Sequence, residues 1–141
     1  MALILKYSRK GGLCFYYQEI FTAKREHTKM KLKTVNQNRE FLRAYKKGRS
    51  FVDSTVVMYV FKNRYGFLRF GITSSKKVGN AVKRNRARRV IRASVRALEF
   101  DHSQGYDVIL VARAKTAYVK QQVVESQLRM LAEKAGLLKE C

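Results

Sequence analysis

The alternation of apolar and polar positions first predicts a short helix over residues 38–47. Its apolar stripe consists of Phe41, Leu42 and Tyr45, at the spacing of an amphipathic helix. We expect Asn36 or Asn38 to cap the first turn and Gly48 to follow a cationic last turn as the terminating glycine.

The pattern then changes to that of strands. The run Thr55–Phe61 is β-branched and aromatic, and it is apolar at both alternating sets of positions, as expected of a strand covered on both faces. Val57, Tyr59 and Phe61 share one of these faces. After a loop over residues 62–66, residues 67–73 are predicted to form a second strand of the length expected for a hairpin partner.

A longer helix is predicted over residues 80–98. Its apolar stripe consists of Ala87, Ile91, Val95 and Leu98 and is expected to face the core. Residues 106–112 then form another buried strand, so the succession of strand, helix and strand implies a βαβ crossover. A last helix over about residues 118–138 is predicted to bury Val124, Leu128, Leu131, Ala135 and Leu138.

Composition and charge indicate a folded protein with a polyanionic partner. The chain has 141 residues, of which 46% are hydrophobic, enough for one small domain with a core. It carries 31 lysines and arginines against 10 acidic residues, a formal net charge of +21. Such a charge exceeds what solubility requires. Residues 1–29 show no sustained helical or strand period.

The positive charge is concentrated on the longer predicted helix and the loop before it. From Lys76 to Arg96 there are nine basic residues and no acidic residue. A solvated charged face would normally intersperse Glu or Asp four residues from Lys or Arg. Because like charges repel along this whole segment, we expect a nucleic-acid contact in preference to a face exposed only to solvent.

The sequence indicates no catalytic or metal site carried by the protein itself. Cys14 and Cys141 lie near opposite ends of the chain, and His27 and His102 stand alone, so neither a disulfide scaffold nor a zinc site is expected. The acidic residues after residue 29 are mostly isolated, which argues against a two-metal nuclease centre. No apolar stretch has the length of a membrane span or the form of a signal peptide, so a cytoplasmic protein is expected.

A second surface is suggested by aromatic positions. Phe41 and Tyr45 on the first helix, with Val57 and Tyr59 on one strand face, could form a groove in which an extended single strand stacks. Taken alone, without knowledge of a family, Phe41 and Tyr45 are better interpreted as core residues.

The segment from Phe70 to Arg92 resembles the signature of the bacterial ribonuclease P protein subunit. Its hallmark is an Arg-Asn-Arg triplet that opens a basic helix, present here as Arg84, Asn85 and Arg86. The likeness extends to residues 38–48 and to the strand from Tyr106 to Arg113, and it covers roughly residues 31–138. It implies an α+β fold: a small single-domain α/β sandwich of order α-β-β-β-α-β-α with a left-handed βαβ crossover, an exception to the usual right-handed rule.

The resemblance also implies a division of labour within a ribonucleoprotein. In this family a catalytic RNA subunit (P RNA) with bound Mg²⁺ removes the 5′ leader of precursor tRNA, and the protein binds the leader and broadens substrate specificity. The protein is therefore expected to be an auxiliary subunit that holds no cofactor alone. Family members bind divalent metal weakly, but the sequence does not indicate which residues are the ligands.

Two sets of site residues follow from the resemblance. Phe41, Tyr45, Val57 and Tyr59 would line a cleft for the single-stranded leader, with Tyr45 standing where the family often has Phe. The basic surface toward RNA would consist of Lys76, Lys77, Asn80, Lys83, Arg84, Asn85, Arg86, Arg88, Arg89 and Arg92. Which arginine contacts the catalytic RNA and which the leader is left open.

Residues 1–29 have no counterpart in the recognised pattern, and the domain is expected to span residues 30–141. We expect residues 1–29 to be either a loosely ordered extension or the product of a translation start assigned upstream of Met30. Three alternatives to a ribonuclease P subunit are a ribosomal protein or assembly factor, a self-sufficient nuclease, and a DNA architectural protein.

Overall fold

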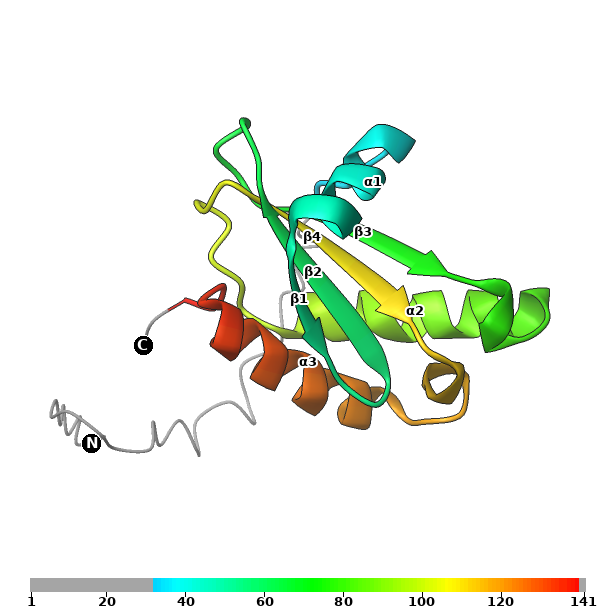
Figure 1. The fold of residues 1–141 in the computed structure, drawn as a ribbon. Helices are drawn as coiled ribbons and strands as arrows, with labels where there is room; N and C mark the ends of the chain where they lie inside the picture. The colour runs from blue at the N-terminus through cyan, green and yellow to red at the C-terminus, as the bar shows by residue number, and fades with distance from the viewer. Residues whose placement is uncertain (1–31, 140–141) are drawn as a thin grey trace, which may run out of the picture. The chain divides into compact units, whose positions relative to one another are not determined.

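The computed structural model describes residues 32–139, which form three α-helices and four β-strands (Figure 1). The helices are α1 (Asn38–Lys47), α2 (Ala81–Ala97) and α3 (Gln121–Ala135), and the strands are β1 (Arg49–Val52), β2 (Val56–Lys62), β3 (Arg69–Ser74) and β4 (Tyr106–Ala112). Two short 3-10 helices, η1 (Lys76–Val78) and η2 (Ala114–Ala117), precede α2 and α3. This order confirms the predicted α-β-β-β-α-β-α sequence of elements.

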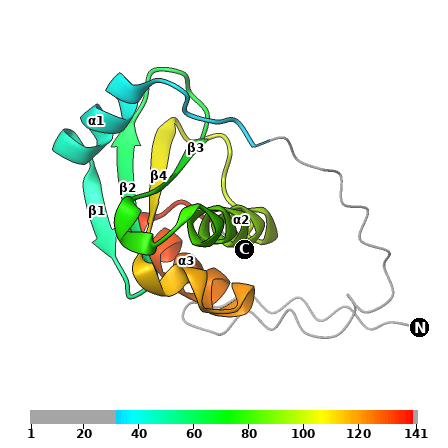
Figure 2. The ribbon, with the colours of Figure 1, turned by 90° about the vertical axis from the view of Figure 1, so that its right-hand side faces the viewer.

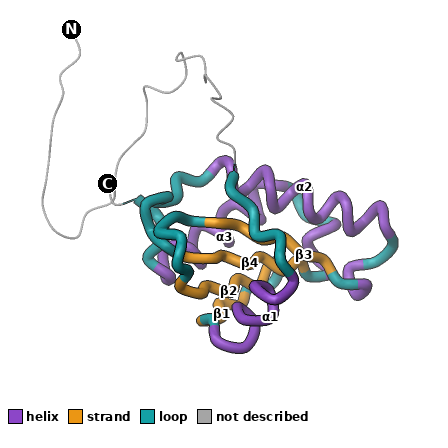
Figure 3. The backbone as a smooth tube through the Cα atoms, turned by 90° about the horizontal axis from the view of Figure 1, so that it is seen from above, coloured by secondary structure: helices purple, strands orange, loops and turns teal. Residues whose placement is uncertain are grey.

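The four strands form one sheet in the order β1-β2-β4-β3, which Figure 3 shows from above. β1 and β2 pair antiparallel, as do β2 and β4, whereas β3 and β4 are parallel. The predicted pairing of β2 with β3 is therefore wrong. β4 lies between them because Val108, Ile109 and Leu110 are buried on both faces, and only an interior strand provides two covered faces.

The helices divide between the two faces of the sheet. Figure 2 shows α2 and α3 on one face and the short α1 on the other. The connection from β3 through α2 to β4 is the predicted βαβ crossover. Viewed from the helix side with β3 pointing upward, β4 lies to the left of β3 (Figures 1 and 2), which makes this crossover left-handed.

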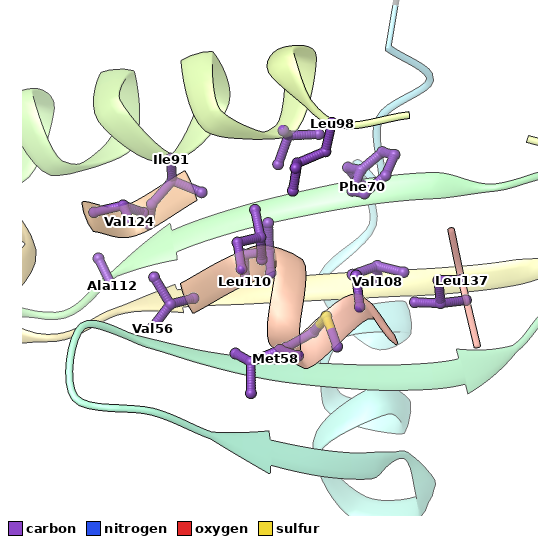
Figure 4. Close-up of a cluster of buried hydrophobic side chains, with 14 of the residues drawn as sticks. Val56, Met58, Phe70, Ile91, Leu98, Val108, Leu110, Ala112, Val124 and Leu137 are labelled. Atoms are coloured by element: carbon purple, nitrogen blue, oxygen red, sulfur yellow. The ribbon is translucent and has the colours of Figure 1, made fainter. Parts of the chain in front are cut away.

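The main core fills the space between the sheet and the α2–α3 layer (Figure 4). Val56, Met58 and Val60 of β2 point into it and are buried. The predicted core stripe of α2 is buried in full: Ala87, Ile91, Val95 and Leu98. Among residues 32–139, no helix is both long and apolar enough to cross a membrane.

The opposite face of the sheet carries a thinner core. Val35, Ala44 and Ile109 are buried there, and partly buried side chains, including those of Phe41 and Tyr59, pack around them. Within residues 32–139, α1 and the segment before it that carries Val35 cover this face only in part, so Val57, Tyr59 and Phe61 of β2 are half-buried. The prediction that β2 is covered on both faces therefore holds only in part.

α1 has the predicted bounds, but its ends and buried face differ from expectation. Gln37 is the N-cap residue and no side chain caps the first turn, so the prediction of an Asn36 or Asn38 cap is wrong. Gly48 has φ −76°, and a Cβ there would lie 2.4 Å from the Ala44 carbonyl oxygen. Close packing, not left-handed backbone, therefore requires this glycine. Leu42, predicted on the apolar stripe, is 50% exposed.

α3 is shorter than predicted at both ends. η2 occupies residues 114–117, and Gly136, with φ 70°, ends the helix. The amides of Gly136 and Leu137 bond back to the carbonyls of Glu133 and Ala132, which is the Schellman arrangement. Leu138 therefore lies beyond the helix and pairs with Phe100 in an isolated bridge. The rest of the predicted stripe is buried as expected: Val124, Leu128, Leu131 and Ala135.

A buried ion-pair network attaches α1 to the sheet. Arg69 of β3 donates from Nε and Nη2 to the two carboxylate oxygens of Asp107 on β4, at 2.8 and 2.7 Å. Its Nη2 also donates to Glu40 Oε1 of α1 at 3.0 Å. All three residues are less than 10% exposed. The hydrogen bonds to Asp107, opposed by burial and reinforced by Glu40, raise the pKa of Arg69 above its usual value.

Replacing Arg69→Ala is expected to lower the free energy of unfolding by about 3–5 kcal/mol, because it leaves two carboxylates buried without their partner. Urea denaturation measures the change. Arg129→Ala on the exposed side of α3 is the matched control, expected to change stability by no more than about 0.5 kcal/mol. Equal effects of the two substitutions would contradict a stabilising role for the network.

Candidate nucleic-acid interface

The outer face of α2 presents the predicted basic residues together. None of its 17 residues is acidic, and Asn80 caps its N-terminus. The more exposed members of the predicted set are Lys76, Lys77, Asn80, Asn85, Arg86, Arg89 and Arg92, while Lys83, Arg84 and Arg88 are partly buried. We call these ten residues the basic surface. Because the N-terminal end of a helix carries a partial positive charge, the start of α2 adds to the attraction for phosphate.

Several members of the basic surface also have structural partners within the protein. Asn80 Oδ1 accepts a hydrogen bond from the Lys83 amide at 3.0 Å, which occupies its carbonyl oxygen with capping. Asn85 Oδ1 accepts from an Arg88 guanidinium nitrogen. Arg86 Nε donates to the Ala117 carbonyl at 2.9 Å and so attaches η2 to α2. The asparagines therefore shape this surface in addition to any contact they make with a ligand.

The aromatic residues predicted for the second site meet on the α1 face of the sheet. The rings of Tyr45 and Tyr59 pack edge to face, with centroids 5.1 Å apart. The Tyr45 hydroxyl lies 3.3 Å from Thr73 Oγ1. A depression of about 300 Å³ is lined by Asn36, Asn38, Phe41, Tyr45 and Thr73. We call Phe41, Tyr45, Val57 and Tyr59 the aromatic cleft.

Not all predicted members of the aromatic cleft line the depression. The ring of Tyr59 packs against the ring of Tyr45. Val57 lies two positions before Tyr59 on the same face of β2, where it is paired with Val52 and Val111. Asn36 and Thr73 line it although sequence reasoning did not select them. Thr73 could have been found from its alternation with Gly71 on β3, since alternate residues of a strand share a face.

Gly71 allows the ring of Phe41 to lie directly on the sheet. A Cβ at this position would be 2.7 Å from Phe41 Cε1 and 2.7 Å from Ile109 Cδ1, closer than atoms can approach. Phe41 is consequently half-buried against the strand backbone. It therefore belongs both to the thin core and to the aromatic cleft, which combines the two interpretations left open by the sequence.

The acidic residues offer no metal centre within residues 32–139. No group of three or more His, Cys, Asp or Glu is found there. Glu40 and Asp107, which appear isolated in the sequence, converge instead on Arg69. The pKa of Asp101 is lowered by the hydroxyl and amide of Ser103, which donate to its carboxylate. Cys14, Cys141 and His27 lie outside the described residues.

Comparison with known proteins identifies the family. The family model described as Ribonuclease P matches residues 18–136. The chain belongs to the ribonuclease P protein family. It is 39% identical over 109 residues to the ribonuclease P protein component of Clostridium botulinum strain 657, covering 77% of this chain and 98% of that protein. A Thermoanaerobacter component is 36% identical over 76% of this chain and 92% of its own length.

Solved structures of ribonuclease P proteins share the fold. The Staphylococcus aureus protein has a TM-score of 0.65 at 30% identity, covering 77% of this chain and 100% of that one. The Thermotoga maritima protein has a TM-score of 0.60 at 25% identity, covering 72% and 96%. A further neighbour is a mutant of the S. aureus ribonuclease P protein with defective mRNA degradation activity.

Membership in the family decides between the classes considered from sequence. The chain thus belongs with the protein components of ribonuclease P, which indicates a subunit role in tRNA processing. A ribosomal protein or a DNA architectural protein is thereby set aside.

Gly71→Ala is expected to destabilise the ribonuclease P protein by about 1–3 kcal/mol, the usual cost of overpacking, because Phe41 must leave its place on β3. A double-mutant cycle measured by urea denaturation checks the cause. In a Phe41→Ala background the cost of Gly71→Ala should shrink, leaving only the contact with Ile109. An unchanged cost would show that Phe41 does not lie over Gly71.

Proposed function

We propose that this ribonuclease P protein binds the catalytic RNA through the basic surface and the single-stranded 5′ leader through the aromatic cleft. The RNA, with bound Mg²⁺, carries out hydrolysis of the phosphodiester bond. The protein contributes affinity for the leader and so broadens the range of precursor tRNAs that are processed.

The observation that carries this proposal is the unbalanced charge of α2. A 17-residue helix with seven basic and no acidic side chains gains no support from ion pairs between successive turns. Phosphates would provide the missing counter-charge, and each arginine guanidinium matches phosphate geometry with two parallel N–H donors. The helix is kept in place by its buried stripe, so its basic residues are presented on a rigid element.

The shape of the aromatic cleft suits an unpaired strand. Tyr45 is 39% exposed and is held by Tyr59 and Thr73, so a base can stack without first ordering the ring. Base stacking on an aromatic side chain contributes roughly 1–3 kcal/mol. β3 continues from Thr73 directly toward Lys76 and Lys77 of η1, which would place positive charge where the leader leaves the cleft.

The described part of the protein contains no cluster of side chains of the kind that binds a catalytic metal. Glu40 and Asp107 are buried and neutralised by Arg69. These residues therefore do not fit a catalytic Mg²⁺ site. We accordingly assign the catalytic metal to the RNA.

Cleavage of a precursor tRNA with a 5′ leader by a bacterial ribonuclease P RNA tests this function. At low, near-physiological Mg²⁺, the protein is expected to stimulate cleavage by the RNA strongly, because it neutralises phosphates that would otherwise repel the substrate. The protein alone should release no leader.

The protein alone is also incubated with an mRNA substrate. The reason is that a mutant of the S. aureus ribonuclease P protein is described as defective in mRNA degradation activity. Leader release by the protein alone would show that it carries catalytic groups of its own. Failure of the protein to stimulate the RNA would reject the subunit mechanism proposed here.

Tyr45→Ala, alone and with Phe41→Ala, is expected to weaken binding of precursor tRNA to the holoenzyme. Loss of stacking for one or two bases should cost about 1–4 kcal/mol, as base–aromatic stacking does elsewhere. Binding of mature tRNA, which lacks the leader, should change little. Equilibrium binding of the two RNAs measures the difference.

The control for this pair is Leu42→Ala on the same helix, since Leu42 is 50% exposed and does not line the depression. It should leave both affinities unchanged. Equal loss of affinity for precursor and mature tRNA in the Tyr45→Ala variant, with folding intact, would refute the assignment of the leader to this cleft.

A further inference from the structure

An exposed aromatic side chain stands outside the aromatic cleft, at the junction of η2 and α3. Tyr118 follows Ala117 directly, and its side chain is 66% exposed. Its hydroxyl has no hydrogen-bond partner among residues 32–139. Neither the basic surface nor the aromatic cleft includes this residue, and it contributes nothing to the main core.

The backbone beneath Tyr118 is held rigidly. Its amide bonds to the Lys115 carbonyl at 3.0 Å, and the Ala117 carbonyl accepts the 2.9 Å hydrogen bond from Arg86 of α2. Thr116, fully buried, donates from its hydroxyl to the Thr55 carbonyl. An exposed ring on a fixed base loses little further conformational freedom when it binds a partner.

One basic side chain contacts the ring, and other basic residues lie near it in the structure or in the sequence. The Lys83 ammonium lies 5.0 Å from the centroid of the Tyr118 ring, within the range of a cation–π contact. Arg86 uses only Nε in its bond to Ala117, so its terminal nitrogens point to no partner within the described chain. Lys115 and Lys120, three residues before and two after Tyr118, are both exposed.

This combination suits a nucleotide. An exposed ring offers a stacking surface to any base, and cations at its edge bind the phosphates on either side of that base. A protein partner of ordinary composition would have to bury these cations at a cost. η2 packs against η1 and α2, on the opposite side of the sheet from the aromatic cleft. A base at Tyr118 therefore belongs to the RNA that covers α2.

We propose that Tyr118 is a stacking platform for an unpaired base of the ribonuclease P RNA, with Lys83, Arg86, Lys115 and Lys120 holding the adjacent phosphates. The inference rests on the contact between α2 and the catalytic RNA proposed above. It extends the basic surface past α2 onto η2. It also adds a contact that is made to a base and not to a phosphate.

Substitution of Tyr118 separates stacking from charge. Tyr118→Ala is expected to weaken binding of the full-length protein to a bacterial ribonuclease P RNA by about 5- to 100-fold, the range that corresponds to one stacked base. Tyr118→Phe keeps the ring and should bind within about twofold of the unchanged protein. Because no phosphate contact is lost, the dependence of affinity on salt should keep its slope in both variants.

Fluorescence gives a second, direct measurement. The chain contains no tryptophan, so Tyr118→Trp introduces a single indole whose emission a stacked base quenches. Quenching is expected on addition of the ribonuclease P RNA and not on addition of a short single-stranded leader oligonucleotide. Met130→Trp, at a position 50% exposed on α3, is the matched control and should keep its emission with either RNA.

The outcomes separate this inference from the proposed function. If the unchanged protein binds the RNA tightly while Tyr118→Ala binds equally well, or the indole at position 118 is not quenched, the stacking platform is refuted and the basic surface stands. Quenching by the leader oligonucleotide alone would overturn the assignment to the RNA subunit. Absence of binding by the unchanged protein would reject both proposals.

Discussion

The ion pairs of Arg69 join α1, β3 and β4, and the positions of the two cleft residues on α1, Phe41 and Tyr45, depend on them. Along β3, Arg69, Gly71 and Thr73 occupy alternate positions on one face. The first binds a carboxylate of α1, the second lies beneath an aromatic ring of α1, and the third meets a tyrosine hydroxyl of α1. α1 has only ten residues and no side-chain cap, so it is too short to be stable by itself. Its helical form and its orientation come from these contacts.

The two faces of the sheet divide the work of the domain. Between the sheet and the layer of α2 and α3 lies a dry core that provides most of the stability. Among the described residues, the other face is covered by the short α1 and the segment that carries Val35, which leaves Tyr45 and Tyr59 accessible beside a shallow depression. α2 contributes to both functions, because its inner stripe anchors the fold while its outer arginines face away from the core. A rigid presentation of charge follows from this amphipathic arrangement.

Several sequence predictions were confirmed and several were wrong for identifiable reasons. Helical spacing located Ile91 and Leu128 in the core because burial of an apolar stripe leaves a direct record in the sequence. The predicted pairing of β2 with β3 was wrong. The prediction paired strands that are neighbours along the chain, but β4 is the more apolar strand and takes the interior position between them. Leu42 was wrongly placed on the buried stripe, because the buried side of α1 carries Glu40, which reaches Arg69, and Ala44. The signature motif identified the basic surface, yet it did not distinguish Asn80 as a capping residue.

The sequence by itself determined the class of fold, the order of elements, the concentration of positive charge and the family, because periodicity, charge and motif are properties of neighbours along the chain. Only the tertiary structure decided the strand order, the meeting of Glu40 and Asp107 on Arg69, and the closeness of Phe41 to Gly71. These contacts join residues about 30 to 40 positions apart, and no local pattern encodes them. They arise because the whole sheet must bury both faces of β4 at once. The ring of Tyr118 lies beside α2 because the hydrogen bond from Arg86 to Ala117 attaches η2 to that helix.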